Sequence, residues 1–355
     1  MAELLDVLKA AVDQKATDIF LTGGAAPMAM ISGRLIALQG FTPLAGRDVM
    51  NMLMGNLFEE QRRIIQEKLE LDCSLQLAQL GRIRMNITTQ KNGPHAVIRM
   101  IPSAIPHPED LELPPAVTKL AELPRGLVLL TGPAASGKTV TLACLIEEIN
   151  KKRDAHVVTI EDPIEFSFVS HNALVCQREI GTHTLSYASA LKSVPRQRAD
   201  VVLIGELRDM ETAEAALHIA ESGSLVMSTL STHNSTQTIE RIVNMFPVER
   251  HRQISLRLAA CLKAAISQVL MPRADGKGMV CAREIMIVNP AIESAIRDGK
   301  AALIYDAIEK GSALGMVNMD KAILRLVRNK VVTQQVALEK SHYPDSLQNA
   351  MAALR

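Results

Sequence analysis

Hydrophobic and polar positions alternate with two different periods along the first hundred residues. The chain opens with an amphipathic helix, whose apolar residues recur at helical spacing: Leu4, Leu8, Ala11 and Val12. The other predicted elements are, in chain order, strands at 18–21 and 28–31, a hairpin turn at Gly33-Arg34, helices at 46–55 and 59–69, and strands at 82–88 and 96–100. This mixture predicts a small α+β domain.

A proline-rich stretch follows, with Pro102, Pro106, Pro108, Pro114 and Pro115. Proline disfavours helix at the residue before it and cannot donate to a strand ladder, so we expect an interdomain linker at 101–115. Beyond it, helical segments alternate with apolar strands at 127–130, 157–160, 201–204 and 225–230, which predicts a mostly parallel sheet covered by helices. The expected domains are therefore 1–100, an α/β core over 116–290, and a wholly helical region over 291–355.

Length and composition agree with two domains and narrow the function. A chain of 355 residues exceeds what one hydrophobic core usually serves. A net charge of +1 gives no reason to expect nucleic acid as the main partner. The five cysteines form no Cys-x-x-Cys pair, so we expect reduced, mostly buried thiols. The chain has no apolar run of the ~18 residues a membrane span needs, and its acidic start is unlike an export signal, which predicts a cytoplasmic protein.

The strongest chemical signal lies between the strand at 127–130 and a helix predicted from Val140 to Ile149. Its residues are Gly132, Pro133, Ala134, Ala135, Ser136, Gly137, Lys138 and Thr139. This pattern in a strand–loop–helix setting predicts a phosphate-binding P-loop, in which backbone N–H groups and the helix start surround the phosphates of ATP. Lys138 would neutralise the outer phosphates and Thr139 would hold Mg²⁺. The alternative is a glycine-containing turn that matches the pattern by accident.

Carboxylates follow two further strands. Glu161, Asp162 and Glu165 come at the end of the strand at 157–160, where α/β proteins bind ligands, and one of them could orient the attacking water. An acidic loop or a helix cap is the structural alternative. Glu206 follows the strand at 201–204, where a carboxylate would support hydrated Mg²⁺. We expect Arg208 and Asp209 to form structural pairs.

These three motifs, in this order, resemble the PilT/PilU branch of type IV pilus retraction ATPases within the secretion ATPase superfamily. The resemblance runs nearly end to end and includes segments at 17–21, 27–28, 125–129, 159–166 (the Asp box), 200–209 (the Walker B segment), 284–287, 290–292 and 314–316. It implies an N-terminal PAS-like α+β domain followed by a RecA-like P-loop ATPase domain with a helical C-terminal region. The two Cys-x-x-Cys pairs typical of the related extension ATPases are missing, which favours the retraction branch.

The resemblance also implies roles for individual residues. Glu165 would be the general base that polarises water, and Glu206 would assist Mg²⁺. Arginines that would approach the γ-phosphate, from the same or a neighbouring subunit of a homohexamer, occupy matching positions at Arg82, Arg84, Arg99 and Arg196. A guanidinium there would stabilise the charge that develops during phosphoryl transfer. An ordinary surface ion pair is the alternative role for each of them.

The chain departs from the family pattern at its His box. Ser224 and Ser231 stand where relatives have histidines, and serine cannot carry a positive charge, so we expect weaker sensing of the γ-phosphate. His233 would share a strand face with Ser231 if the strand persists, and is either a substitute or a polar surface residue.

Two further segments also differ from relatives. Ala134-Ala135 replaces the family's usual Thr-Gly, and a methyl group restricts position 135 if it takes positive φ, which would slow turnover. The segment 291–298 keeps only the outline of its family counterpart. These changes indicate a divergent or accessory member.

The resemblance therefore implies a hexameric ATPase that drives pilus retraction and twitching through an inner-membrane platform protein. Such a protein would lie in the cytoplasm, peripheral to the inner membrane at the pilus base. The serine replacements keep a second function open, that of a weakly hydrolysing accessory subunit that docks on an active, paralogous retraction motor. A related DNA-uptake or secretion ATPase is a third alternative.

Overall fold

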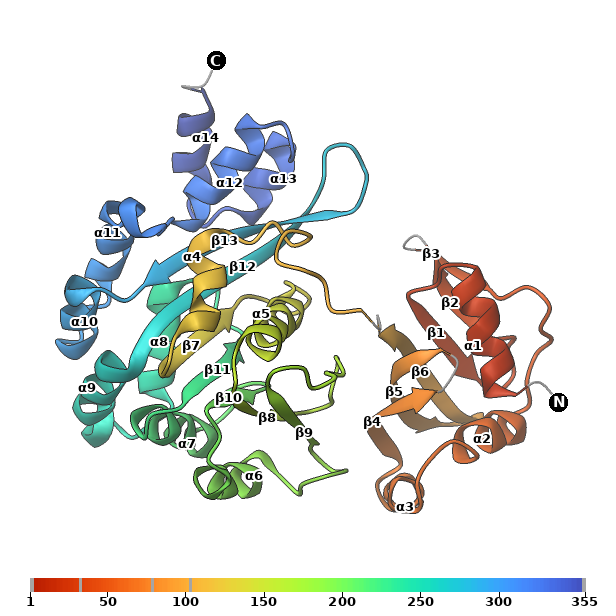
Figure 1. Cartoon of the computed structure of the whole chain (residues 1–355). Helices are drawn as coiled ribbons and strands as arrows, with labels where there is room; N and C mark the ends of the chain where they lie inside the picture. Colours follow the sequence, from red (N-terminus) through yellow and green to blue (C-terminus); the bar gives the residue numbers. More distant parts are fainter. Residues whose placement is uncertain (1–2, 32–33, 78–79, 102–103, 353–355) are drawn as a thin grey trace. The chain divides into compact units, whose positions relative to one another are not determined.

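The computed structural model describes residues 3–31, 34–77, 80–101 and 104–352 (Figure 1). The chain divides into two compact units, and the short segment Pro163–Ser167 belongs with the first of them. The first unit is Met1–Ala104 with that segment, and the second is Ile105–Asp162 with Phe168–Arg355. Among the described residues, no helix is both long enough and apolar enough to cross a membrane.

The first unit is a six-stranded antiparallel sheet with three helices. The strand order is β3-β2-β1-β6-β5-β4. Its strands are β1 (Asp18–Thr22), β2 (Met28–Ile31), β3 (Arg34–Ala37), β4 (Glu70–Leu77), β5 (Gly81–Gln90) and β6 (Gly93–Ile101), and its helices are α1 (Leu4–Asp13), α2 (Gly46–Met54) and α3 (Glu59–Lys68). Alternate residues of β5, namely Ile83, Met85 and Ile87, are buried in the core, which leaves the intervening side chains on the opposite face.

These elements confirm the predicted helices and the four predicted strands β1, β2, β5 and β6. Two strands are absent from the prediction. All four residues of β3 are exposed, so this edge strand lacks the alternation that marks a half-buried strand. β4 follows directly on the charged helix α3 with only Leu69 between them. Of the predicted hairpin turn, Gly33 lies outside the described residues and Arg34 begins β3.

The second unit is built on a seven-stranded sheet with the order β13-β12-β7-β11-β10-β8-β9. Its strands are β7 (Gly126–Thr131), β8 (His156–Glu161), β9 (Leu174–Glu179), β10 (Val201–Ile204), β11 (Leu225–Leu230), β12 (Leu262–Pro272) and β13 (Met279–Ile287). All neighbours are parallel except the β12–β13 hairpin. The predicted mostly parallel sheet is confirmed.

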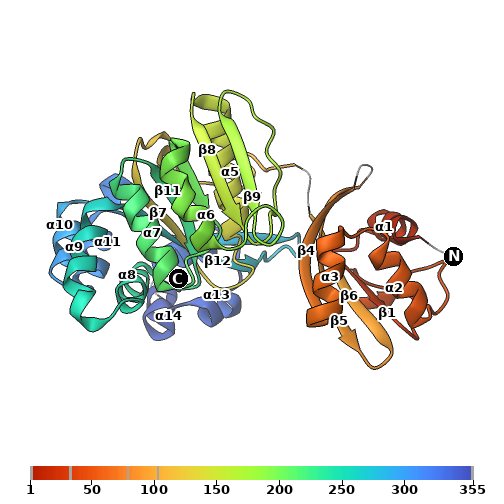
Figure 2. The same ribbon diagram turned by 90° about the horizontal axis from the view of Figure 1, so that it is seen from below.

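Helices cover both faces of this sheet, which explains the continuous apolar runs of the central strands. The helices before and between the strands are α4 (Pro115–Thr118), α5 (Lys138–Lys152), α6 (Tyr187–Ser193), α7 (Met210–Glu221), α8 (Ser235–Asn244) and α9 (His251–Cys261), with 3-10 turns η1 (Lys119–Glu122), η2 (Val194–Gln197) and η3 (Val248–Arg250). Along β7, Leu127 and Leu129 pack with α6, α7 and α9, whereas Val128 and Leu130 pack with α4 and α5 on the other face (Figure 2).

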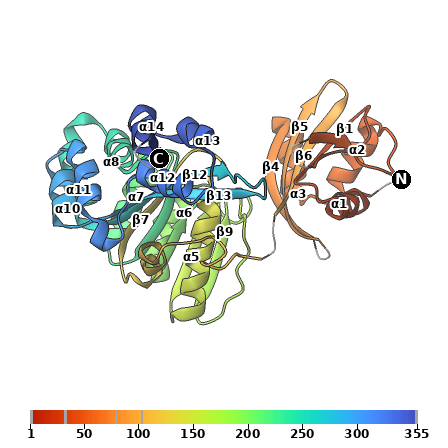
Figure 3. The ribbon, with the colours of Figure 1, turned by 90° about the horizontal axis from the view of Figure 1, so that it is seen from above.

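Beyond Pro290 the chain is helical, as predicted. The elements are α10 (Pro290–Arg297), α11 (Ala302–Lys310), η4 (Ser312–Leu314), α12 (Met319–Arg328), α13 (Gln334–Lys340) and α14 (Pro344–Ala352). The last three helices pack on one end of the β12–β13 hairpin (Figure 3). All five cysteines are free thiols, as expected, and burial raises the pKa of Cys144 and Cys261 to about 12.

Candidate nucleotide-binding site

The P-loop lies at the carboxyl end of the buried strand β7, and α5 begins at its last residues. Gly132 has φ 138°, and a Cβ there would lie 2.3 Å from the carbonyl oxygen of Gln268 on β12, so the loop can approach this strand only with glycine. Gly137 has φ 85° and is the N-cap of α5. The loop therefore turns sharply and presents the free N–H groups of the α5 N-terminus at the sheet edge.

The P-loop side chains suit a phosphate group. The ammonium Nζ of Lys138 donates to the carbonyl oxygens of Gly132 at 2.7 Å and Pro133 at 2.8 Å, which places a positive charge inside the loop. The hydroxyl of Ser136 is buried and has no hydrogen-bond partner among the described residues. A polyphosphate would supply acceptors for both groups.

Ala135 occupies the left-handed region, with φ 59°. From the sequence, we expected the methyl group of residue 135 to restrict the backbone if this position takes positive φ. The structure shows that it does. An alanine in this conformation costs roughly 1–2 kcal/mol relative to the right-handed region. Ala134, its neighbour, is not among the residues with positive φ.

Glu206 and Asp162 meet at the same edge as the P-loop, through one arginine. Arg208 Nε donates to Glu206 Oε2 at 2.9 Å, and Arg208 Nη1 lies 3.1 Å from Asp162 Oδ2. The hydrogen bond with Glu206 raises the pKa of Arg208. The expected structural pairing of Arg208 is confirmed, whereas Asp209 caps α7 by accepting from the Thr212 N–H at 2.8 Å. A metal at Glu206 would draw on a carboxylate that already has a cationic neighbour.

Glu161 is held inside the protein. Its side chain is 6% exposed, and Oε1 accepts from Thr159 Oγ1 at 2.6 Å and from Gln177 Nε2 at 3.1 Å. These bonds tie the end of β8 to β9. Of the three carboxylates predicted near this strand, Glu161 therefore has a structural role.

Glu165 lies in the segment Pro163–Ser167 of the first unit, beside two of the predicted arginines. Arg84 Nη1 is 3.5 Å from Glu165 Oε1, and Arg82 Nε donates to the Ile164 carbonyl at 2.7 Å. Arg82 and Arg84 are two residues apart on β5 and so project from the same face. The structure thus brings three of the predicted site residues together.

The other two predicted arginines lie elsewhere. Arg99 is the cross-strand partner of Arg84, but its Nε donates to Asp18 Oδ1 at 2.7 Å. Arg196 lies on η2, where the neighbouring Gln197 carbonyl is 3.0 Å from Nδ1 of His156, the first residue of β8. Arg196 is therefore at the amino edge of the sheet, opposite the P-loop of the same chain.

The structure places the two His-box serines at opposite ends of one strand, and their effect on sensing of the γ-phosphate stays a prediction. Ser224 precedes β11 and its hydroxyl donates to the Ala199 carbonyl at 2.8 Å, at the amino edge. It is separated from Ser231 by the length of β11, about 23 Å at roughly 3.3 Å per residue. Only Ser231 follows the strand at the P-loop edge.

The condition under which Ser231 and His233 would share a strand face is not met. β11 ends at Leu230, and His233 is an exposed loop residue whose N–H donates to Gln237 Oε1 at 3.3 Å. The strand cannot continue because Asn234 caps α8, accepting from the Gln237 N–H at 2.8 Å.

A cavity of ≈ 200 Å³ lies beside the P-loop. Ser136, Gly137, Val140 and Thr141 line it from the P-loop and α5, and the β12–β13 hairpin contributes Gln268, Leu270, Met279, Val280, Cys281 and Arg283. Arg283 Nη2 donates to the Leu111 carbonyl at 2.9 Å, which fixes residues 110–112 as a further wall. A mostly apolar cavity adjoining a phosphate loop suits the base and sugar of a nucleotide. The hairpin residues were missed because no local pattern links them to a loop more than a hundred positions earlier.

Three comparisons with known proteins complete the description of the site. The sequence matches the family described as Type II/IV secretion system protein over residues 3–351. It is 39% identical over 344 residues to a twitching motility protein of Neisseria gonorrhoeae, covering 97% of this chain and 92% of that protein. It is 38% identical to the type IV pilus retractation ATPase PilT of Pseudomonas aeruginosa, with coverages of 97% and 99%. The fold matches the crystal structure of the pilus retraction motor PilT with bound ADP, with a TM-score of 0.92, 35% identity and coverages of 98% and 100%.

Proposed function

The chain belongs to the Type II/IV secretion system protein family, and on that premise we propose that it is an ATPase motor that powers retraction of type IV pili. The observation that carries the proposal is the P-loop geometry. Lys138 lies inside a loop whose glycines and buried hydroxyl suit a polyphosphate, beside a cavity that suits a nucleoside.

The proposed roles follow from the chemistry of each side chain. Lys138 and the α5 N-terminus hold the phosphates, and Thr139 and Glu206 hold Mg²⁺. Among the described residues no three His, Cys, Asp or Glu side chains gather as a metal site, so the nucleotide and water would complete the coordination. Glu165 polarises the attacking water, and Arg82, Arg84 and Arg99 of the first unit supply positive charge to the γ-phosphate. Arg196, at the amino edge of the sheet, would do so toward the site of a neighbouring subunit.

We also propose how the domains and subunits of the protein are organised. The antiparallel first unit would be a PAS-like domain over 1–100, joined by the linker 101–115 to a RecA-like core over 116–290 and the helical region 291–355. We propose a homohexamer at the cytoplasmic face of the inner membrane, acting on a platform protein with or without a paralogous ATPase. The strand order of the two sheets and the coverage of PilT and PilU relatives support this proposal.

Replacement of Glu165 by glutamine tests the catalytic assignment. Loss of a general base lowers kcat by about 10²- to 10⁴-fold, while binding of a fluorescent ATP analogue should stay within about threefold. The matched control is Glu249→Gln, because Glu249 is an exposed residue of η3 remote from the P-loop in sequence and fold. Unchanged steady-state hydrolysis by Glu165→Gln would remove Glu165 from the site.

The same assay addresses the accessory alternative. Ser231 at the P-loop edge and Ala135 at positive φ both favour slow turnover. Tight ATP binding with negligible hydrolysis by the wild-type protein would support an accessory subunit over a motor.

A further inference from the structure

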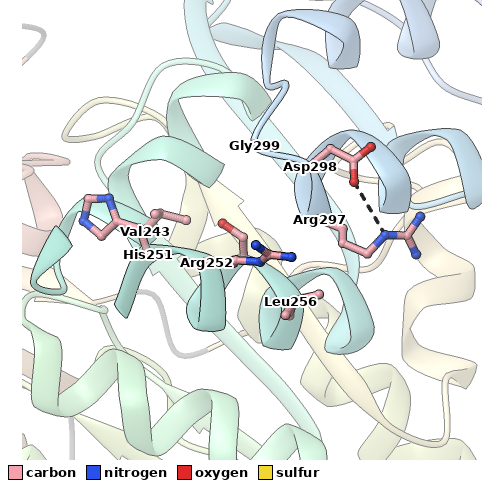
Figure 4. A pocket seen from close by; sticks show the side chains of 8 residues that line it. Val243, His251, Arg252, Leu256, Arg297, Asp298 and Gly299 are labelled. Carbon is pink, nitrogen blue, oxygen red and sulfur yellow. Dashed lines mark ion pairs between the residues drawn. The ribbon is translucent and has the colours of Figure 1, made fainter. Parts of the chain in front are cut away.

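A second cavity, which shares no lining residue with the one beside the P-loop, lies among α8, α9 and the end of α10 (Figure 4). Its volume is ≈ 730 Å³. In this view Arg252 and Leu256 lie between His251 and the Arg297–Asp298 pair. We call this cavity the α9–α10 groove. None of the proposed nucleotide chemistry uses it.

Three arginines on or beside α9 differ in their partners. Arg250 donates to Glu214 at 2.5 Å and Arg257 to Glu221 at 2.7 Å, so both guanidinium groups are satisfied by α7. Arg252 has no hydrogen bond or ion pair with any other residue that the structure describes. Around α9 it lies about 140° from Arg257, at roughly 100° per residue, and so faces away from Glu221.

Among the residues that line the groove, guanidinium groups outnumber carboxylates. Arg297 Nη2 donates to Ser294 Oγ at 3.2 Å, and its two ion pairs are long, 3.7 Å to Asp298 and 4.0 Å to Glu293 outside the lining. His251 Nε2 is held 2.9 Å from the Phe246 carbonyl. Asp298 is the one carboxylate among the lining residues, against the guanidinium groups of Arg252 and Arg297.

Apolar surface accompanies this charge. Leu256, one helical turn after Arg252, is 46% exposed, and Val243 of α8 lines the same groove. A ligand that matches both features carries carboxylates beside an aliphatic group. A free inorganic anion would satisfy only the arginines and leave the leucine in water.

We propose that the α9–α10 groove binds an acidic segment of a partner protein, in which Asp or Glu side chains pair with Arg252 and Arg297 and an aliphatic side chain packs on Leu256. Two guanidinium groups can each take a carboxylate in two parallel hydrogen bonds, which fixes the segment's register. The proposal concerns a surface outside the nucleotide site and does not depend on the ATPase assignment.

The test uses the full chain and a fluorescein-labelled octapeptide of glutamates with two leucines, followed by fluorescence anisotropy. Wild-type protein should bind the peptide saturably and more weakly as salt rises. Arg252→Glu should lower the affinity at least about tenfold, and Arg252→Lys should recover part of it because lysine keeps the charge without the fork. Arg328→Glu, an exposed arginine at the end of α12, is the matched charge reversal and should change nothing.

Several results would overturn the proposal. These are an absence of saturable binding, equal effects of Arg252→Glu and Arg328→Glu, or displacement of the peptide by inorganic phosphate at matched charge. Sedimentation of the same variants adds one more: if Arg252→Glu dissociates assemblies of the chain, the groove is a contact between copies instead. If Arg252→Glu does not fold, Arg252→Gln replaces it, and circular dichroism checks the folding of both variants.

Discussion

The two edges of the parallel sheet carry polar groups of opposite character. At the carboxyl edge, the P-loop places Lys138 and the α5 N-terminus beside the Glu206–Arg208–Asp162 cluster. At the amino edge, Ser224 bonds the Ala199 carbonyl and the His156 N–H donates to Asp200 at 2.8 Å, so these groups close loops onto one another. Charged side chains around the proposed nucleotide site therefore gather at the carboxyl edge, whereas the polar groups at the amino edge hold neighbouring loops together.

Of the changes at the two edges, removal of the Lys138 ammonium group should have the largest effect, and it should act on ATP affinity. Lys138→Ala leaves the phosphate charge uncompensated, and loss of one partner of a close charge pair costs about 2–5 kcal/mol. We expect the Kd for a fluorescent ATP analogue to rise by about 30- to 4,000-fold at roughly 1.4 kcal/mol per factor of ten. The control is Lys192→Ala on α6, whose amino group is exposed and pairs with Glu211 at 3.6 Å. Unchanged ATP binding by Lys138→Ala would refute the P-loop assignment.

Histidine substitutions at the two serines compare the edges directly. Ser231→His adds an imidazole at the carboxyl edge and should raise kcat, by about tenfold if phosphate sensing limits turnover. Ser224→His should leave kcat unchanged and lower the free energy of unfolding by about 1 kcal/mol, because it removes the hydrogen bond to Ala199.

Steady-state hydrolysis and thermal melting of the two single variants separate these effects. A rate increase from Ser224→His alone would contradict the edge assignment. No change from Ser231→His would mean that other groups already meet the phosphate.

The sequence predicted what local patterns encode and missed what long-range pairing decides. Buried central strands and the P-loop are visible because apolar runs and glycine positions are local features. The amino-edge position of Ser224 was missed because the His box was treated as one site. Its two serines in fact lie at opposite ends of β11. The edge strand β9 was missed because only Glu179 of its six residues is buried, and the hairpin wall of the cavity depends on pairing across the fold.

The structure gives Arg84 a contact that the sequence did not predict, and it does not test the predicted role of Arg84 at the γ-phosphate. Its position on β5 was matched to a phosphate-binding role, and the structure places its guanidinium 3.5 Å from Glu165. Both side chains are about one-third exposed, so the pair contributes little to stability. The ion pair would instead help to position the carboxylate of Glu165, the proposed general base. The role of Arg84 at the γ-phosphate stays a prediction.

The smallest expected effect lies within the P-loop, where two adjacent alanines differ in backbone conformation. Ala135→Gly removes the steric cost of positive φ, which exceeds the entropy that glycine adds to the unfolded chain. We expect a gain of roughly 0.5–1 kcal/mol, or about 1–4 °C in melting temperature. Ala134→Gly, where φ is not positive, should instead cost about 0.5–1 kcal/mol. Calorimetry of the two variants without nucleotide measures the difference, and shifts of the same sign would show that the turn at 135 is not the source of strain.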